Sequence, residues 1–520
     1  MKYFIAIFLL GWSGIVLAQR LPVSVRKGDQ AMQVADYYTA LHYFRQALAQ
    51  KPSPDVRFRL AEAARSFHAW ALAQTHYEIL LAEPAAAQFP QARLGLAEAL
   101  LAQGQYEKAE VALVRFLKTP PEHAPTRLRA EAALQSCRWA LAQPPDTVWQ
   151  LTRLPGRINS PYGEFGAWQS GDTLFYTSYQ FDKANDKYTP TRKISKLMFS
   201  TDEKRGRQMA KSVNTDTAHT AYMTIAPGQR EMYFARCQFT EGAAIQCQLC
   251  KRKKDRRGRW EAAFEVLPPS INMPGFTHTQ PSLLFDTSTQ QLYLLFASNR
   301  PGGQGGMDIW AAAIPAKGDI WGNPQPLASI NTAFDDITPS FLEKTATLYW
   351  ATNAPPSFGG YDLWSATYTG HLSFGERTHT GPGLNSSYDE YAPFFKHPDS
   401  GYFSSNRPGG RFVDEDSQTC CPDIFKAQRK TTPPRIEITA DTLVQFVENT
   451  PVVPISSTTE MPSTLEDFLP LTSTSTTTSR NLAPAKQPLP KPIPKPGRAT
   501  CKGKIPTTNN TRTTAKGRMP

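Results

Sequence analysis

Five polar side chains stand at matching positions of an internal repeat and could supply acid, base or ligand chemistry. His278, Asp336 and Glu390 each lie three residues before a proline that opens an apolar strand. Alignment of the earlier repeats places Glu164 and His219 at the corresponding positions. If these strands are the innermost strands of a ring, we expect the five side chains to surround one mouth of a central channel.

Two interpretations of this ring follow from the residue types. Paired carboxylates flank the scissile bond in glycoside hydrolysis, so Glu164, Asp336 and Glu390 would be the candidates in a propeller glycan hydrolase. A ligand or metal site is a related possibility. In the other interpretation, which we favour, the five side chains bond to neighbouring backbone and stabilise the ring.

Familiar catalytic and nucleotide-binding motifs are missing from the sequence after residue 18. It contains no nucleophile elbow, P-loop, dinucleotide fingerprint or HExxH. We therefore predict no catalytic residue, cofactor or metal ion, and treat the ring as a candidate surface for a ligand or partner.

The repeat that carries these residues is a strand, a glycine-rich turn and a second strand. Asn299 and Asp308 bracket one turn and Asn353 and Asp362 bracket another, each pair nine residues apart. In the last copy, Asn406 and Asp423 are seventeen apart, which indicates an insertion of eight. We expect these six side chains to be structural, with the aspartates accepting backbone amides after each turn.

An apolar residue followed by asparagine marks the start of each repeat, and the spacings are 55, 58, 59 and 54 residues. The asparagines are Asn159, Asn214, Asn272, Asn331 and Asn385. Four strands per interval predict a five-bladed β-propeller over residues 147–428. The fifth repeat lacks its fourth strand, so we expect residues 148–154 to complete that blade and leave no open edge.

The segments outside the propeller have different compositions. Residues 1–18 have the apolar core and small-residue end of a secretory signal peptide. Residues 22–143 show helical periodicity with small residues at Ala40 and Ala47, which predicts a tetratricopeptide (TPR) solenoid, an ordinary helical bundle being the alternative. The predicted fold is thus an α-solenoid followed by a five-bladed propeller. Residues 429–470 are expected to be a linker or short β segment, and residues 471–520 a disordered tail rich in Pro, Thr and Lys.

Charge and cysteine content restrict the function further. The net charge is +12, but residues 471–520 contain ten Lys or Arg and no acid, which leaves about +2 for the rest. A nucleic-acid-binding face is therefore not expected. Of seven cysteines, Cys237, Cys247 and Cys250 lie on one long hairpin. We expect one cross-strand disulfide there, because Cys237 and the Cys247/Cys250 pair lie on opposite arms of the hairpin. A zinc site is not expected, because a lone CxxC lacks the further ligands, and a thioredoxin-like redox site would require a helix start where this segment is a predicted strand.

The motif Ser298-Asn299-Arg300-Pro301-Gly302-Gly303 through Asp308-Ile309-Trp310 resembles the WD40-like β-propeller repeat of the TolB type. With the signal peptide and TPR segments, residues 1 to about 430 resemble periplasmic TPR, β-propeller and OmpA-like proteins associated with the outer membrane, some of which serve type IX secretion. The resemblance implies an exported, periplasmic, outer-membrane-associated scaffold without enzymatic activity. Such a scaffold would bind envelope proteins through the TPR groove and the propeller mouth.

The C-terminal part departs from that pattern because no OmpA-like, peptidoglycan-binding domain is recognisable. Family members continue from a Leu-Pro-Leu-Thr segment into Tyr-Phe-Asp-Asn-Asp, whereas Leu469-Pro470-Leu471-Thr472 is followed here by a Ser/Thr run. Codons for this run, displaced by one base, can encode Tyr-Phe-Asp-Asn-Asp-Phe. A frameshift and a natural basic tail are the two alternatives, and wall anchoring is not expected with either.

Overall fold

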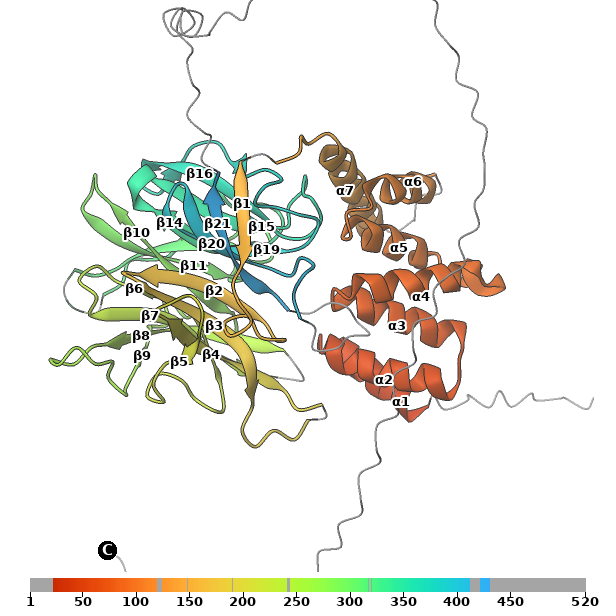
Figure 1. Ribbon diagram of the computed structural model, residues 1–520, viewed down its shortest axis with the longest axis horizontal. Coiled ribbons are helices and arrows are strands. Elements are labelled where there is room, and N and C mark those ends of the chain that lie inside the picture. Colours follow the sequence, from red (N-terminus) through yellow and green to blue (C-terminus); the bar gives the residue numbers. More distant parts are fainter. Residues whose placement is uncertain are drawn as a thin grey trace, which may run out of the picture. The chain divides into compact units, whose positions relative to one another are not determined.

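The computed structural model describes residues 22–118, 124–146, 148–188, 190–240, 244–316, 318, 320–411 and 421–430. Within these residues, seven α-helices precede five antiparallel sheets (Figure 1). The predicted signal peptide, the tail from residue 471 and nearly all of the 429–470 segment lie outside the described residues. No helix in the described part is long and apolar enough to cross a membrane.

The helices pack one against the next through small residues. Phe44 of α2 lies so close to Gly28 of α1 that a Cβ at position 28 would overlap its ring, and Tyr77 of α4 meets Gly95 of α5 in the same way. Asp36 and Ser53 cap the amide groups of α2 and α3. The helices are α1 (Val23–Gln33), α2 (Tyr37–Gln50), α3 (Pro54–Ser66), α4 (Trp70–Ala82), α5 (Gln91–Leu101), α6 (Tyr106–Leu117) and α7 (Ala124–Leu141), with a 3-10 turn η1 (Pro84–Gln88).

The predicted TPR solenoid is not clearly formed by these seven helices, and the described chain is mainly propeller. The small residues on which that prediction rested, Ala40 and Ala47, are indeed buried. Small side chains permit close approach in any array of adjacent antiparallel helices. Their presence therefore reports close packing and does not by itself specify a superhelix.

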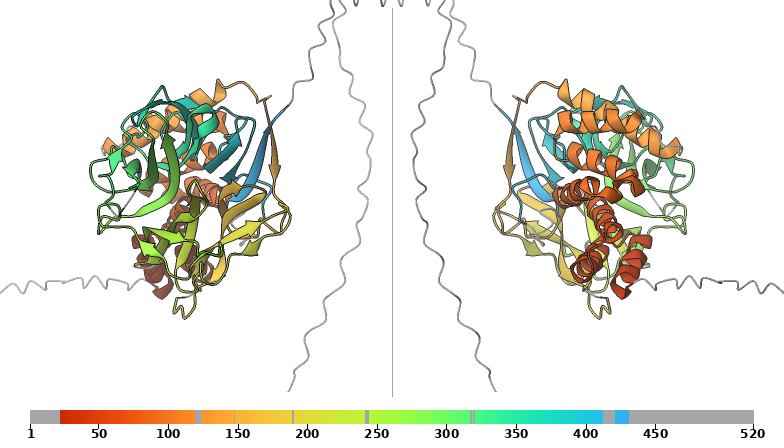
Figure 2. Two further views of the ribbon diagram at one scale, coloured as in Figure 1. Left: turned by 90° about the vertical axis from the view of Figure 1, so that its left-hand side faces the viewer. Right: turned by 90° about the vertical axis from the view of Figure 1, so that its right-hand side faces the viewer.

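The five sheets form the predicted five-bladed propeller, and Figure 2 shows the helices on one side of it. Blade one contains β2 (Glu164–Ser170), β3 (Thr173–Asp182), β4 (Lys193–Ser200) and β5 (Arg207–Gln208), and blade two contains β6 (His219–Ile225), β7 (Glu231–Phe239), β8 (Ile245–Lys253) and β9 (Glu265–Val266). Blade three contains β10 (His278–Asp286), β11 (Gln291–Ser298), β12 (Asp308–Ala313) and β13 (Gln325–Pro326), and blade four contains β14 (Asp336–Leu342), β15 (Thr347–Thr352), β16 (Asp362–Gly370), β17 (Ser373–Phe374) and β18 (Thr378–His379), with the 3-10 turn η2 (Glu343–Thr345). Blade five contains β19 (Glu390–His397), β20 (Ser400–Ser405), β21 (Asp423–Arg429) and β1 (Trp149–Arg153).

Blade five joins the two ends of the ring. Strand β1 pairs antiparallel with β21, with Trp149 opposite Arg429 and Arg153 opposite Phe425. The innermost strands β2, β6, β10, β14 and β19 contact one another in sequence, and β19 contacts β2. The ring is thus closed through the strand that precedes the first blade.

Each innermost strand contains a β-bulge where it lines the channel. Amides of three bulge residues bond to side chains of the preceding blade: Tyr222 N to Thr177 Oγ1 at 3.0 Å, Thr338 N to Gln280 Oε1 at 3.1 Å and Ala392 N to Thr338 Oγ1 at 2.9 Å. The bulge residues with left-handed backbone are Gly166 (φ 64°), Tyr222 (45°), Gln280 (57°), Thr338 (52°) and Ala392 (51°). This belt of bonds holds neighbouring blades together along the channel.

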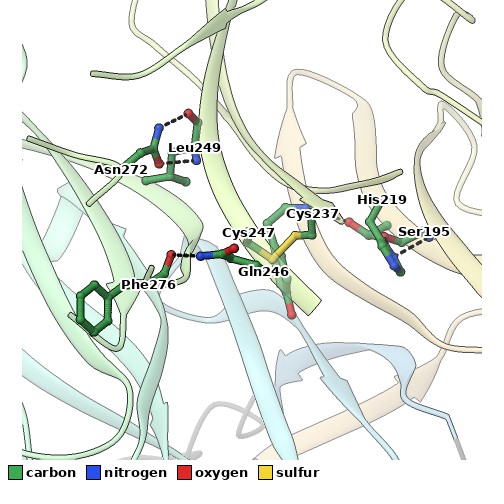
Figure 3. The surroundings of a disulfide bond; sticks show 10 residues. Ser195, His219, Cys237, Gln246, Cys247, Leu249, Asn272 and Phe276 are labelled. Carbon is green, nitrogen blue, oxygen red and sulfur yellow. Dashed lines mark hydrogen bonds between the residues drawn. A yellow bond between two sulfur atoms is a disulfide. The ribbon is translucent and has the colours of Figure 1, made fainter. Parts of the chain in front are cut away.

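A buried asparagine clamps each blade to the next. Asn272 accepts the amide of Leu249 at 2.8 Å and donates to the carbonyl of Leu249 at 2.9 Å (Figure 3). The same two bonds form between Asn159 and Ile424, Asn214 and Leu197, Asn331 and Ile309, and Asn385 and Leu363. A side-chain amide has both a donor and an acceptor, so it can pair with both polar groups of one strand residue.

We predict that Asn272→Ala lowers the free energy of unfolding by about 2–4 kcal/mol, because the buried amide of Leu249 loses its partner, whereas its carbonyl keeps the Leu267 amide. The carbonyl of Leu267, to which Asn272 also donates at 2.8 Å, is left unpaired as well. Chemical denaturation would measure the change. The exposed Asn323→Ala is the matched control and should stay within about 0.5 kcal/mol of the parent. Equal stability of the two variants would contradict the clamp.

Candidate functional site

The five ring residues are the first residues of the five innermost strands. Glu164, His219, His278, Asp336 and Glu390 open β2, β6, β10, β14 and β19, so the structure brings all five to the same end of the channel. All five side chains are buried. Burial distinguishes them from the exposed groups that usually surround an open channel mouth.

Each ring carboxylate is held by the turn that follows the clamping asparagine. Glu164 accepts the amide and hydroxyl of Ser160, both at 2.7 Å, and Glu390 accepts those of Ser386 at 2.7 and 2.6 Å. Asp336 accepts the amide of Thr332 at 2.5 Å and its hydroxyl at 2.9 Å. These bonds fix the loop that leads into each innermost strand. They are bonds to neighbouring backbone of the kind expected if the ring residues have a structural role.

The two ring histidines bond in a similar way. The Ser195 amide donates to Nδ1 of His219 at 3.1 Å, and Nε2 of His278 lies 3.0 Å from the Met273 carbonyl. Burial lowers the pKa of both histidines to about 4. Both imidazoles are therefore neutral near pH 7 and serve as hydrogen-bonding groups.

Burial has the opposite effect on the ring carboxyls, because it disfavours the charged form. It raises the pKa of Glu164 to about 7 and that of Asp336 to about 6. It also raises the pKa of Glu390, although Arg407 lies 2.9 Å from the carboxylate and opposes the shift. A proton is thus available on Glu164 and Asp336 at a pH where exposed carboxyls are ionised.

Helices cover the blade-four and blade-five loops at this end. Tyr106 of α6 donates to the carbonyl of Phe358 at 2.8 Å, and the Ser357 amide donates to Ser136 of α7 at 3.3 Å. His68, in the α3–α4 loop, lies 2.9 Å from Asp389. The segment that precedes Glu390 is therefore in contact with the helices.

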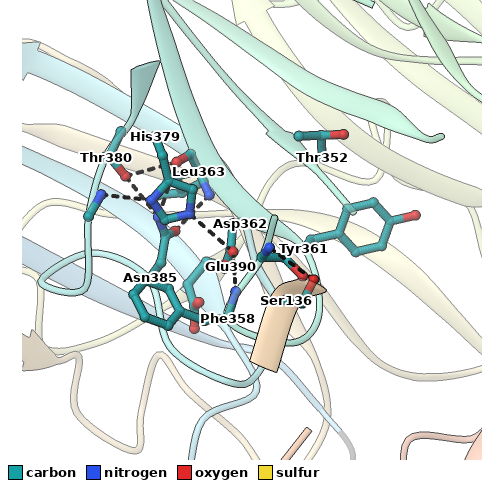
Figure 4. A network of polar contacts seen from close by, with 12 residues as sticks. Ser136, Thr352, Phe358, Tyr361, Asp362, Leu363, His379, Thr380, Asn385 and Glu390 are labelled. Carbon is teal, nitrogen blue, oxygen red and sulfur yellow. Dashed lines mark hydrogen bonds and ion pairs between the residues drawn. The ribbon is translucent and has the colours of Figure 1, made fainter. Parts of the chain in front are cut away.

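Beneath these contacts lies a sealed polar network (Figure 4). His379 Nε2 lies 3.1 Å from Asp362, and the Phe358 amide donates to the same carboxyl oxygen at 2.6 Å. Burial lowers the pKa of His379 to about 4; burial and the nearby Glu390 raise that of Asp362. The uncharged forms of both groups are favoured, and Trp139 of α7 packs its ring on the imidazole. This pair is a structural contact.

The other predicted turn residues bond as follows. Asn299, Asn353 and Asn406 accept the amides of Thr277, Asp335 and Asp389, at 2.8, 2.9 and 2.8 Å. Asp308 accepts the amides of Gln304 and Gly305 at 3.0 and 3.3 Å. Asp423 differs, because its carboxylate pairs with Arg153 of β1 at 2.5 Å. The insertion after Asn406 separates Asp423 from its turn in the sequence, and the neighbouring strand supplies its partner.

Among the predicted cysteines, Cys237 and Cys247 are joined across β7 and β8, whereas Cys250 is buried and reduced (Figure 3). In an antiparallel pair, Cys247 is directly opposite Cys237 and Cys250 is opposite Phe234. Within the described residues, no group of three or more His, Cys, Asp or Glu side chains could hold a metal ion.

A pocket of about 280 Å³ lies beside the start of β14. Trp350 and Trp364, a directly opposed pair on β15 and β16, form part of its wall. Its other lining includes Gln304, Asn331, Thr332, Phe334, Thr352 and Arg377. Thr332 also holds Asp336, so the ring carboxyl lies directly behind the pocket wall.

Three polar atoms at this place have unused bonding capacity. Oδ1 of Asp336 and the indole nitrogens of Trp350 and Trp364 have no partner in hydrogen-bond geometry among the described residues. The Trp350 indole is nevertheless close enough to Asp336 to lower the pKa of the carboxyl against the larger effect of burial. Buried polar groups without partners are rare and indicate a site when they border a pocket.

The sequence interpretation overlooked this pocket. It named Asp336 but not the two tryptophans, Phe334, Gln304 or Arg377. One signal was present, since two tryptophans stand fourteen residues apart around a glycine turn, a spacing that places them side by side in a hairpin.

Comparisons with known proteins give solved structures only. No family model matches the chain, and no curated protein matches it. A thermostable family-43 glycoside hydrolase is similar with a TM-score of 0.35 and 9% identity, over 54% of this chain and 94% of that one. The inulosucrase from Halalkalicoccus jeotgali bound to kestose gives 0.37 and 12% over 57% and 94%. The alpha-L-arabinofuranosidase from Lactobacillus brevis gives 0.35 and 10% over 54% and 95%.

These findings correct the family prediction. The resemblance to TPR, TolB-type and OmpA-associated envelope proteins is wrong, because no family model matches and the similar structures are glycoside hydrolases and an inulosucrase. The same comparisons contradict the non-enzymatic scaffold and the secretion role inferred from that resemblance. At these identities and TM-scores the likeness is to the fold alone, and the reactions of those enzymes are not transferred to this chain.

The buried Glu164 should make stability depend on pH. Its pKa is raised from 4.5 to about 7 in the folded protein, so the folded state binds the proton more tightly than the unfolded state. The free energy of unfolding must then fall as pH rises from about 4.5 to about 7. We predict that Glu164→Gln removes a decline on the order of 3 kcal/mol across this window.

Urea denaturation at several pH values would measure the effect. Glu376→Gln, at an exposed position in the β17–β18 loop, is the matched control and should keep the pH dependence of the parent protein. Parallel pH curves for the parent and Glu164→Gln would show that Glu164 is ionised throughout, contrary to this prediction.

Proposed function

We propose that the protein acts on a glycan, which it binds in the pocket beside β14 and whose glycosidic bond it hydrolyses. The observation that carries the proposal is a pocket that combines aromatic rings with neutral hydrogen-bonding side chains and lies beside a buried carboxyl, Asp336, whose pKa is raised to about 6.

The lining favours a saccharide over other small molecules. The rings of Trp364 and Phe334 offer flat apolar surfaces for the C–H faces of a sugar, and the buried Trp350 lies opposite Trp364 in the sheet. The amide of Gln304 and the hydroxyl of Thr332 can bond to sugar hydroxyls, whereas the Asn331 amide is already paired with both backbone groups of Ile309. A volume of about 280 Å³ suits a ligand of one or two sugar rings.

Hydrolysis needs an acid that is protonated at the working pH. Asp336 is suited to this role, and Thr332 connects it to the pocket: its hydroxyl, which lines the wall, donates to Asp336 at 2.9 Å, and for transfer it would give its own proton to the leaving oxygen and take the proton of Asp336 in its place. The leaving oxygen would receive a proton through this path, while water adds its hydroxyl to the anomeric carbon and its proton to a second carboxylate. Glu390, at the same position of the adjacent strand β19, is the first candidate for the second group.

Location and partners stay predictions from the sequence. We propose an exported, periplasmic protein on the basis of the signal-peptide pattern of residues 1–18, with contacts to other envelope proteins and none to nucleic acid.

The proposal predicts separable effects on binding and cleavage. Trp364→Ala should weaken binding of a neutral oligosaccharide about tenfold, since it removes one aromatic face. Asp336→Asn should bind with nearly parental affinity and release no reducing sugar. Calorimetry and a reducing-end assay over a panel of neutral oligosaccharides would measure both properties.

Trp168→Ala, which alters a tryptophan of the channel lining on β2, is the control and should change neither property. Thermal melting would confirm that each variant is folded. Absence of both binding and cleavage across the panel in the folded parent protein would refute the proposal, as would equal losses in Trp364→Ala and Trp168→Ala.

A further inference from the structure

A second concave surface lies at the seam where the first and last blades meet. Its volume is about 750 Å³, and it is lined by the β1–β2 connection, the β4–β5 loop and the beginning of the β20–β21 loop. We call it the seam groove. Its charged lining consists of Arg157, Lys204, Arg205, Arg207, Arg411 and Asp202, five cations and one anion.

The cations of the seam groove are exposed and have no ion-pair partner among the described residues. Elsewhere in the described chain, arginines such as Arg192 and Arg429 pair with nearby acids. Asp202 offsets only one of the five positive charges, and its carboxylate accepts the amides of Lys204 and Arg205, both at 2.9 Å, and the Ser200 hydroxyl at 3.0 Å. Five like charges that face one hollow repel each other, and an anionic ligand would relieve this repulsion.

The walls of the groove are held in place by the fold. The Gly206 amide donates to the Arg157 carbonyl at 3.1 Å, which ties the β4–β5 loop to the β1–β2 connection. On the same loop, Glu203 accepts from Tyr402 at 2.6 Å and pairs with Lys426 at 2.8 Å, both in blade five. A Cβ at Gly206 would overlap the Tyr176 hydroxyl, so the loop lies directly against blade one. The cations are therefore carried on fixed backbone.

The residue types narrow the ligand class. Four of the five cations are arginine, whose planar guanidinium binds carboxylate, sulfate and phosphate groups in a bidentate manner. The lining contains no aromatic side chain on which a nucleic-acid base could stack. The volume exceeds that of a single inorganic anion and suits a short chain that carries several charges.

We infer that the seam groove binds an acidic oligosaccharide, a short sugar chain that carries carboxylate or sulfate groups. The inference uses residues distinct from the pocket beside β14 and does not depend on hydrolysis there. It adds a second sugar-binding surface, selective for charge, on the rim of the propeller.

Calorimetry on the full-length protein with a short oligogalacturonate, and with its uncharged methyl ester, tests the inference. The acid should bind with an affinity that falls as salt is raised, and the ester should not bind at the groove. Arg205→Gln/Arg207→Gln should weaken binding of the acid about tenfold or more, because each charge-assisted bond contributes roughly a tenfold change.

The matched control is Arg256→Gln/Arg257→Gln, which removes the same charge from exposed positions of the β8–β9 hairpin and should change the affinity little. Equal losses in the two double variants would overturn the inference in favour of non-specific attraction. Equal affinity for inorganic phosphate, for the methyl ester or for a short oligonucleotide would also overturn it. Retained binding of the acid in Trp364→Ala would separate this site from the pocket beside β14.

Discussion

The bond pattern on which the propeller depends is the double hydrogen bond from a buried asparagine to one residue of the preceding blade. It satisfies a buried amide at the boundary between two sheets, which would cost about 1–3 kcal/mol if left unpaired, and it gives the carbonyl of the same residue a second donor beside a backbone amide. Because it also fixes where the next innermost strand begins, each ring residue follows its asparagine by five or six positions. The carboxylates then bond to the residue directly after that asparagine, as Glu164 does to Ser160.

This dependence explains why the blade number could be predicted from the sequence. The glycine-rich turn motif fades in the first two blades, but Asn159 and Asn214 keep the spacing because no other side chain of that length offers one donor and one acceptor together. The helical segment was harder to interpret. Close packing of helices, such as that of Phe44 on Gly28, needs small residues in any helical array. The same pattern of small residues therefore fits several helical architectures.

Function was predicted less well for a related physical reason. Residues that recur in every blade form the turns, the clamps and the strand starts that every blade needs. The family resemblance rested on such residues, including Asn299 and Asp308. A binding site on a repeat protein is made from what does not recur. Arg377 in blade four, and Arg205 and Arg207 in blade one, have no counterparts in a repeat alignment, and only the folded arrangement brings them beside Thr332 or Arg157.

The strand β1 has a consequence for how the chain reaches its native state. Its Arg153 pairs with Asp423, 270 positions further along the chain, so the last blade cannot assemble until nearly the whole propeller has left the ribosome. Contacts of such long separation are entropically expensive and slow to form. During synthesis, β1 must therefore wait as an unpaired edge while four complete blades form beside it, which makes this strand the segment most in need of protection from other nascent chains.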